Sequence, residues 1–366
     1  MKKVMVYAYT GLNLGDDLFL KILFERYPDT NFILFARDKY KKVFKQKNVK
    51  IFSSNNLFLR GTNYIMRRLN KNYIINKIIS KTCDASVYIG GSIFQQSDNW
   101  RVDVVKRENL LNENQPFYVL GANFGPYSHD DYYLEYRKVI SKYEDICFRD
   151  TYSYNLFGDL ENVRIADDIV FSLGGDMVNT ETYNNEKNIV ISVIKPSYRS
   201  YLSGYDDLYY EKLKDISIEF IKKGYGITLM SFCKHEGDEE AIREILKIIP
   251  QKYIQYIKQY NYRGSIAESL DIISNSSLII ATRFHAMILG WVFNKPVVPI
   301  AYSEKMTNVM KDVEFNGLYT DFKNLYQLNP VDVGKSIRTN LIDVTKQKEN
   351  SREQFTELDK LLMDSL

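Results

Sequence analysis

The stretch KVMVYAY at residues 3–9, followed by GLNLGDD at residues 11–17, indicates how the chain folds. Apolar side chains dominate the first segment, as in a strand that is buried on both faces. The glycine-containing turn then leads into a predicted helix over about residues 17–26, with Asp16 as its N-cap. A buried strand, a tight turn and a helix in this order are typical of a parallel α/β sheet.

The same rhythm of strand and helix recurs in both halves of the chain. Between the halves, residues 173–187 (LGGDMVNTETYNNEK) contain few apolar side chains and are the best candidate for a linker. We therefore expect an α/β protein with two doubly wound Rossmann-like domains, a GT-B-like architecture, and a ligand cleft between the domains. The predicted strands are NFILFA, ASVYIGG, PFYVLGAN and EDICFRD in the first half, and NIVISVI, YGITLMSF, SLIIATR and KPVVPIAY in the second.

The length of 366 residues suits two domains of ordinary size. We place the first domain at residues 1–175, the second at 188–325 and a charged helical tail at 326–366. A composition of 45% hydrophobic and 26% charged residues is that of a globular protein, which excludes a disordered chain. The first residues lack the pattern of a secretory signal, and no run of about 18 apolar residues occurs, so we expect a cytoplasmic protein.

The distribution of cysteines and charges limits the kinds of site and partner that the chain can have. Three widely spaced cysteines without a CxxC pair favour neither a disulfide framework nor a zinc site, and no motif requires a metal. The net charge is only +3, yet twelve Lys and Arg and no acidic residue lie between Lys39 and Cys83. This basic segment is either a solvated face or a contact for an anionic membrane surface or a lipid-linked diphosphate. No nucleic-acid-binding motif accompanies it, so we expect no nucleic-acid partner.

Three glycine-containing turns follow predicted strands of the first domain. They are GLNLG at 11–15, YIGGS at 88–92 and GANFGP at 121–126. Because the carboxyl ends of parallel strands meet at one edge of a sheet, we expect a binding site there, although plain βα turns would leave the same pattern. The candidate binding residues in these turns are Asn13, Gly15, Asp17, Gly90, Gly91, Ser92 and Asn123.

Three further stretches carry charged side chains at strand ends. In TRFH at 282–285, Arg283 can hold a carboxylate or phosphate and His285 can transfer a proton near neutral pH. The alternative is that Arg283 pairs with a nearby carboxylate and that His285 only packs. Arg149 in FRD and Lys305 in YSEK are additional candidate anion ligands, and a surface ion pair or a solvated lysine is the alternative for each.

Taken together, these stretches resemble the polysaccharide pyruvyl transferase family over about residues 1–312. Two departures are mild: Ser92 stands where many members have a third glycine, and Phe284 where many have leucine. The resemblance implies a GT-B-like fold and transfer of pyruvate from phosphoenolpyruvate to sugar hydroxyls of a surface or capsular polysaccharide precursor, which gives a ketal. The matching stretches, in the family's order, are GLNLGDD, YIGGS, GANFGP, FRDTYS, DIVFSL, NIVISV, ATRFH and YSEKM.

The chemistry implied by the resemblance suggests roles for the candidate residues. Phosphoenolpyruvate, the co-substrate, is a small trianion, for which Arg283, Lys305 and Arg149 are the candidate ligands. His285 is the candidate proton carrier, with Asp16 or Asp17 as its partner toward the acceptor. We expect a lipid-linked or nucleotide-linked sugar acceptor on the first domain, phosphoenolpyruvate on the second, and no other cofactor.

Two other functions fit parts of the sequence. A glycosyltransferase of the same fold would use a nucleotide sugar and would also need an anion site. A non-catalytic glycan-binding protein would not need Arg283, His285 and Lys305 to lie together in the folded chain.

Overall fold

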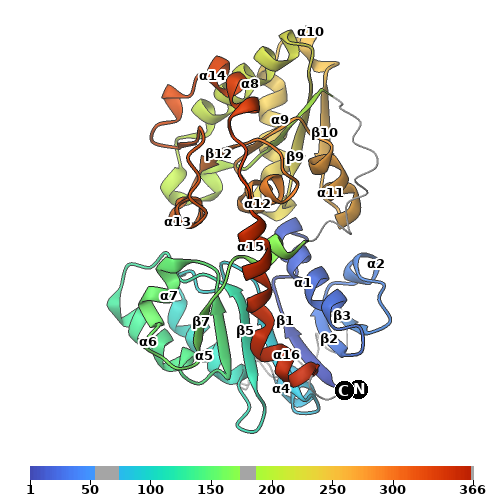
Figure 1. Cartoon of the computed structure of the whole chain (residues 1–366), viewed down its shortest axis with the longest axis vertical. Helices are drawn as coiled ribbons and strands as arrows, with labels where there is room; N and C mark the ends of the chain where they lie inside the picture. Colours follow the sequence, from blue (N-terminus) through green and yellow to red (C-terminus); the bar gives the residue numbers. More distant parts are fainter. Residues whose placement is uncertain (54–73, 174–186, 364–366) are drawn as a thin grey trace. The chain divides into compact units, whose positions relative to one another are not determined.

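The computed structural model describes residues 1–53, 74–173 and 187–363. The chain forms two compact units, each built around its own parallel sheet (Figure 1). The first unit comprises Met1–Thr10, Leu18–Ile169 and Glu349–Leu366, and the second comprises Gly11–Asp17 and Val170–Lys348.

The sheet of the first unit has seven strands, all parallel to their neighbours. These are β1 (Lys3–Tyr7), β2 (Asn31–Ala36), β3 (Val49–Ser53), β4 (Ala85–Ile89), β5 (Phe117–Ala122), β6 (Asp145–Phe148) and β7 (Val163–Ile165), in the spatial order β3-β2-β1-β4-β5-β6-β7. The helices between and after them are α1 (Leu14–Arg26), α2 (Tyr40–Val43), α4 (Ile74–Ser80), α5 (Trp100–Leu110), α6 (Asp130–Ile140), α7 (Thr151–Phe157) and α16 (Thr356–Leu362).

The second unit repeats this arrangement with six parallel strands. These are β8 (Asn188–Ser192), β9 (Gly226–Ser231), β10 (Ile257–Asn261), β11 (Leu278–Ala281), β12 (Val297–Ala301) and β13 (Thr320–Asp321), in the order β10-β9-β8-β11-β12-β13. Its helices are α8 (Asp206–Lys222), α9 (Asp238–Ile248), α10 (Gln251–Ile254), α11 (Ile266–Ser274), α12 (Phe284–Val292), α13 (Glu304–Asp312), α14 (Pro330–Lys335) and α15 (Thr345–Asn350).

Both sheets are doubly wound, as the strand pattern predicts. The strand order reverses between β1 and β4 in the first sheet and between β8 and β11 in the second. In open sheets of this kind, ligands bind beyond the carboxyl ends of the strands at that reversal. The predicted α/β class with two Rossmann-like halves is confirmed.

Burial explains why the strands read as continuous apolar runs. In β8, the side chains of Ile189, Val190 and Ile191 are fully buried, because helices cover both faces of a parallel sheet. Helix α12 is likewise buried over nearly its whole length, which accounts for its almost uniformly apolar sequence.

The turn at residues 11–17 differs from the prediction in two ways. Helix α1 begins at Leu14, and the Asn13 side chain accepts a hydrogen bond from the Gly15 amide at 3.0 Å, so Asp16 lies in the first turn and is not the N-cap. The turn also belongs to the second unit, although the predicted first domain spanned 1–175. One reason is that the Leu14 amide donates to the Phe232 carbonyl at 3.1 Å.

The predicted tail at 326–366 is divided between the units. Residues up to Lys348 belong to the second unit, and those from Glu349 onward belong to the first. Most of the predicted linker, residues 174–186, and residues 54–73 of the basic segment lie outside the described residues. Among the described residues, no helix is long and apolar enough to cross a membrane.

Candidate functional site

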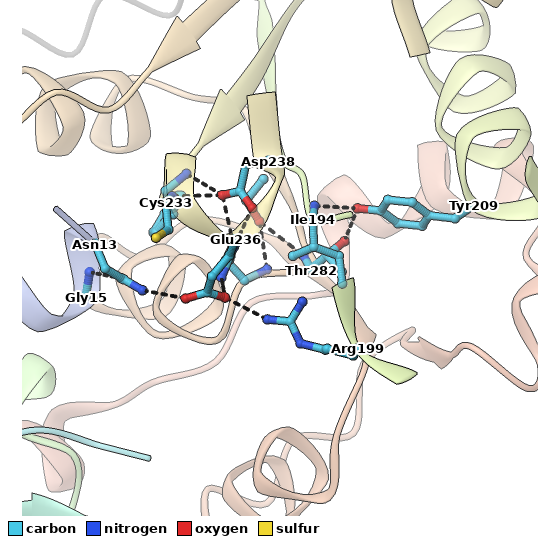
Figure 2. A network of polar contacts seen from close by, with 12 residues as sticks. Asn13, Gly15, Ile194, Arg199, Tyr209, Cys233, Glu236, Asp238 and Thr282 are labelled. Atoms are coloured by element: carbon cyan, nitrogen blue, oxygen red, sulfur yellow. Dashed lines mark hydrogen bonds and ion pairs between the residues drawn. The ribbon is translucent and has the colours of Figure 1, made fainter. Parts of the chain in front are cut away.

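The carboxyl edge of the second sheet carries a dense polar network (Figure 2). The innermost residue of this network is Ser192, the fully buried last residue of β8. The Ser192 hydroxyl accepts hydrogen bonds from the Thr282 amide at 3.0 Å and the Arg283 amide at 3.1 Å, at the point where β11 leads into α12. Tyr209 donates to the Thr282 hydroxyl at 2.8 Å. These bonds fix the start of α12 at the reversal of strand order.

Arg283 forms ion pairs with two carboxylates from the loop after β9. Its Nε donates to Asp238 Oδ2 at 3.1 Å, its Nη2 donates to Asp238 Oδ1, and its Nη1 donates to Glu236 Oε2 at 2.6 Å. Arg283 is only 5% exposed. The structure therefore shows the local carboxylate pairing that the sequence left open as one alternative for this residue.

The two carboxylates differ in their surroundings. Asp238 is fully buried, and burial raises the pKa of its carboxyl although Arg283 and the Cys233 amide act against this. Glu236 accepts from Arg283, from Arg199 Nη2 at 2.8 Å and from Asn13 Nδ2 at 3.2 Å. Burial would raise the pKa of Glu236, but the two guanidinium groups outweigh burial and lower that pKa to about 2.

Two more cations lie beside the aromatic ring of Tyr302. Arg199 lies between the short 3₁₀ turns at Pro196–Tyr198 and Ser200–Leu202, and its Cζ is 4.5 Å from the Tyr302 ring centroid. Lys305 Nζ is 5.2 Å from the same centroid and 5.6 Å from that of Phe284. Tyr302 is 8% exposed; burial would raise its pKa, but the nearby Lys305, Arg199 and Arg283 lower it.

His285 packs against the turn at residues 11–17. A Cβ atom built on Gly15 would lie 1.8 Å from His285 Nδ1, so the glycine backbone directly contacts the imidazole. Asp17 is fully buried and accepts a hydrogen bond from the Tyr262 hydroxyl at 2.7 Å. The second unit thus contains seven of the predicted site residues: Asn13, Gly15, Asp16, Asp17, Arg283, His285 and Lys305.

A separate network occupies the carboxyl edge of the first sheet. Arg149, which follows β6 and has a side chain only 2% exposed, donates to Asp168 at 2.7 Å and to Asn123 Oδ1 at 2.6 Å. The Ser92 hydroxyl donates to the same Asn123 oxygen at 3.3 Å. A Cβ atom on Gly91 would lie 2.5 Å from both terminal nitrogens of Arg149.

Backbone hydrogen bonds join the turns that follow β4 and β5. The Gly90 amide donates to the Leu120 carbonyl at 3.2 Å, and the Asn123 amide donates to the Gly91 carbonyl at 2.9 Å. The candidates Gly90, Gly91, Ser92, Asn123 and Arg149 therefore lie together, as their positions at strand ends predicted. The remaining glycine turn, GLNLG, is the one that belongs to the second unit.

Three members of the second-unit network were not singled out from the sequence: Arg199, Glu236 and Asp238. Each follows the carboxyl end of a buried strand, Arg199 after β8 and the two acids after β9. That position is the available signal, but Asp238 equally suits the first turn of a helix, and Glu236 lies in the short turn just before that helix. In the part of the chain that the structure describes, no group of three or more His, Cys, Asp or Glu side chains suits a metal ion.

Comparison with known protein families shows to which family the chain belongs. A model of the polysaccharide pyruvyl transferase family matches residues 13–304. The chain belongs to this family. The matched range runs from Asn13 in the first glycine turn to Glu304 at the start of α13, so it includes both polar networks except Lys305. No curated protein sequence matches significantly.

Solved structures place this family member among GT-B-like proteins. Anabaena HepE in complex with UDP-glucose is 13% identical, with a TM-score of 0.59 over 98% of this chain and 100% of that chain. The UDP-GlcNAc 2-epimerase of Methanocaldococcus jannaschii is 11% identical, with a TM-score of 0.59 over 98% and 99% of the two chains. The UDP-GlcNAc 2-epimerase of Neisseria meningitidis, bound to UDP-GlcNAc, is 12% identical, with a TM-score of 0.58 over 99% and 100%. At these identities the similarity shows the fold alone.

Proposed function

We propose that this protein transfers pyruvate from phosphoenolpyruvate to hydroxyl groups of a surface or capsular polysaccharide precursor and so forms a pyruvyl ketal. Membership in the polysaccharide pyruvyl transferase family supports a role in polysaccharide modification. The observation that carries the proposal is the arrangement at the carboxyl edge of the second sheet. There, Lys305 lies beside Phe284, the first residue of α12, and the following residue, His285, places its imidazole against Gly15.

The proposed reaction balances without a redox partner. Two sugar oxygens form bonds to C2 of phosphoenolpyruvate, and the bond from C2 to the phosphate oxygen breaks. Of the two hydroxyl protons released, one is delivered to the methylene carbon, which becomes a methyl group, and the other leaves with phosphate. The protein must therefore hold an anion, move protons and exclude competing water.

His285 is the proposed proton carrier. Histidine changes charge near neutral pH, and here the ring is held by the Gly15 backbone, so its orientation is defined. We propose Asp16 as the carboxylate that accepts a proton from the sugar. Asp17 is already bonded to the Tyr262 hydroxyl, which supports a role in holding the turn and not in proton transfer.

The proposed anion ligand among the predicted residues is Lys305. Arg283 keeps the role that its ion pairs support, which is to hold Glu236 and Asp238 at the site. Arg149 is buried in an ion pair with Asp168, and this pairing supports positioning of Asn123 and the Gly91 turn more than direct contact with phosphoenolpyruvate.

We propose that the sugar acceptor binds the turns after β4 and β5 in the first unit. Those turns present Gly90, Gly91, Ser92 and Asn123, whose amides and short polar side chains suit sugar hydroxyls. The acceptor would be lipid-linked or nucleotide-linked, in the cytoplasm or at the inner face of the membrane, with the basic segment as a peripheral contact.

Mass spectrometry tests this function directly. Purified protein is incubated with phosphoenolpyruvate and a panel of lipid-linked and nucleotide-linked sugars, and phosphate release is measured in parallel. The expected result is a sugar that carries one pyruvyl ketal for each phosphate released. Consumption of a nucleotide sugar with no ketal on any acceptor would contradict the proposal.

The second candidate is transfer of a glycosyl group from a nucleotide sugar. It is favoured by the structures of HepE with UDP-glucose and of the Neisseria epimerase with UDP-GlcNAc, which share the fold. Thermal stability separates the two, because a ligand that binds only the folded protein raises its melting temperature. If the proposed function holds, phosphoenolpyruvate should raise the melting temperature. If the second candidate holds, UDP-sugars should raise it and phosphoenolpyruvate should not.

A further inference from the structure

We propose that Arg199 and Lys305 form a phosphate-binding subsite beside Tyr302 in the second unit, and that Arg283 supports this subsite without contacting the ligand. The identification of the ligand as phosphoenolpyruvate rests on the proposed function. The existence of a phosphate subsite does not, because it follows from the contacts of these side chains.

Arg283 is committed to protein carboxylates. Three of its N–H groups donate to Asp238 and Glu236, and Asp238 also accepts from the Phe232 and Cys233 amides at 2.8 and 2.9 Å. Removing one partner of such a buried pair leaves an uncompensated charge, which is strongly unfavourable. These bonds use three of the five N–H groups of Arg283 to hold the two carboxylates in place.

Arg199 is placed differently. Only its Nη2 is bonded to Glu236, while Nη1 is buried and has no hydrogen-bond partner among the described residues. A buried N–H of a charged group without an acceptor is costly, and an oxygen of a bound anion would satisfy it. The Arg199 side chain as a whole is 14% exposed.

The ring of Tyr302 lies beside both cations. Arg199 Cζ and Lys305 Nζ lie 4.5 and 5.2 Å from the same ring centroid, and attraction between a cation and an aromatic face favours both positions. The lowered pKa of Tyr302 has the same origin, since Lys305, Arg199 and Arg283 together favour negative charge at this position.

Ser303, the residue after Tyr302, offers a further hydrogen-bond donor. It is the N-cap residue of α13, its side chain makes no capping bond, and its buried hydroxyl has no partner in the described part of the chain. The first amides of a helix and a neighbouring hydroxyl are groups that bind phosphate oxygens. Arg199, Lys305 and Ser303 therefore match a phosphate monoester better than a neutral sugar.

Isothermal titration of the full-length protein tests the subsite with four probes. These are phosphoenolpyruvate, inorganic phosphate, pyruvate and UDP-glucose. The variants are Arg199→Gln and Lys305→Gln, with Lys247→Gln as a control that removes the same charge from an exposed lysine paired with Glu244. We expect phosphoenolpyruvate and phosphate to bind wild type, and pyruvate to bind at least tenfold more weakly.

Each of the two site variants should weaken phosphoenolpyruvate binding by about 10- to 100-fold, as expected for loss of a hydrogen bond to a charged group, and the control should not change it. Equal binding by wild type and Arg199→Gln would overturn the subsite. If Arg199→Gln does not fold, Arg199→Lys keeps the charge beside Tyr302 but removes the guanidinium donors, so it should bind phosphoenolpyruvate more weakly, and unchanged binding would also overturn the subsite. If UDP-glucose binds tightly and phosphoenolpyruvate does not bind, the subsite belongs to a nucleoside diphosphate sugar and the assignment to phosphoenolpyruvate is rejected.

The subsite and the proposed function can fail separately. Ketal formation with an unchanged Michaelis constant for phosphoenolpyruvate in Arg199→Gln would reject the subsite and keep the function. Phosphate binding that depends on Arg199 and Lys305, with no ketal on any acceptor, would keep the subsite and reject the function.

Discussion

Gly15 and His285 are in direct contact: a Cβ atom on Gly15 would lie 1.8 Å from His285 Nδ1. No side chain fits at residue 15 while the imidazole keeps its position. The contact links the first glycine turn of the sequence to the histidine in the first turn of α12, and it explains why a glycine is required between Leu14 and Asp16.

Replacement of Gly15 by alanine should therefore impair catalysis by moving His285. We expect Gly15→Ala to lower kcat by about 100-fold, since a displacement of about 1 Å in a catalytic group has that effect. The control is Gly226→Ala at the start of β9, where a Cβ atom would meet its nearest neighbour at an ordinary 3.5 Å. Steady-state kinetics and melting temperatures of both variants check the prediction; equal kcat values would refute it.

His285→Ala should nearly abolish turnover while phosphoenolpyruvate still binds. Loss of a general acid or base typically costs about 10²–10⁴-fold in rate. His129→Ala is the matched control, because His129 is exposed at the N-cap of α6 in the first unit. Ketal formation and calorimetric binding are measured for both variants. A near-wild-type rate in His285→Ala would remove this residue from the mechanism.

Glu236→Gln should change how stability depends on pH. The pKa of Glu236 is lowered to about 2 in the folded chain, so its ionised form stabilises the fold above the unfolded-state pKa, and this contribution is lost as the pH falls toward 2. Between pH 6 and pH 3 the wild type should lose about 2 kcal/mol that Glu236→Gln does not lose. Urea unfolding at both pH values measures the difference, and parallel pH profiles would contradict the prediction.

Breaking the buried pair in the first unit should destabilise the protein more than removing it whole. Arg149→Met leaves Asp168 buried without its cation and should cost about 3–5 kcal/mol, whereas Arg149→Met combined with Asp168→Leu should cost less. Denaturant unfolding of the two variants gives both values. A double variant that is less stable than Arg149→Met would contradict the prediction, because it would show that the ion pair as a whole stabilises the fold.

The basic segment predicts binding to anionic vesicles. Arg67, Arg68 and Lys71 lie in its part outside the described residues, so this prediction rests on the sequence. Each basic residue near an anionic surface contributes about 1 kcal/mol, and salt screens the attraction. Sedimentation should show binding to anionic vesicles that is lost at high salt and in the triple glutamine variant. Equal indifference to anionic and neutral vesicles would identify a solvated face.

Periodicity and strand ends were sufficient to predict much of this architecture. Buried apolar runs separated by helices predicted both sheets, and the turns after β4 and β5 meet because parallel strands end at one edge. The unit to which Gly11–Asp17 belongs was not predictable, because it depends on tertiary bonds such as that from Leu14 to Phe232. Local patterns carry no information about such bonds.

The charge balance of the second unit was also hidden in the sequence. Arg283 was visible as a cation next to a histidine, but its two carboxylates lie about 45 residues earlier, at Glu236 and Asp238. Asp238 also suits the first turn of α9, where an acidic side chain favours the helix dipole, and Glu236 lies in the short turn just before that helix. Arg199 followed a strand end without any motif around it. Only the folded chain shows that it shares Glu236 with Arg283.

The closing residues of the chain complete the first sheet. Gln354 accepts from the Gly121 amide at 2.8 Å and donates to the Ala166 carbonyl at 2.9 Å and the Phe148 carbonyl at 3.2 Å. These groups lie near the ends of β5, β6 and β7, and Gln354 itself is fully buried. During synthesis, the ribosome must therefore translate the entire second unit before the first can satisfy its own backbone. Cotranslational folding should leave the amino-terminal half partly open until the segment around Gln354 has been made and can dock on it.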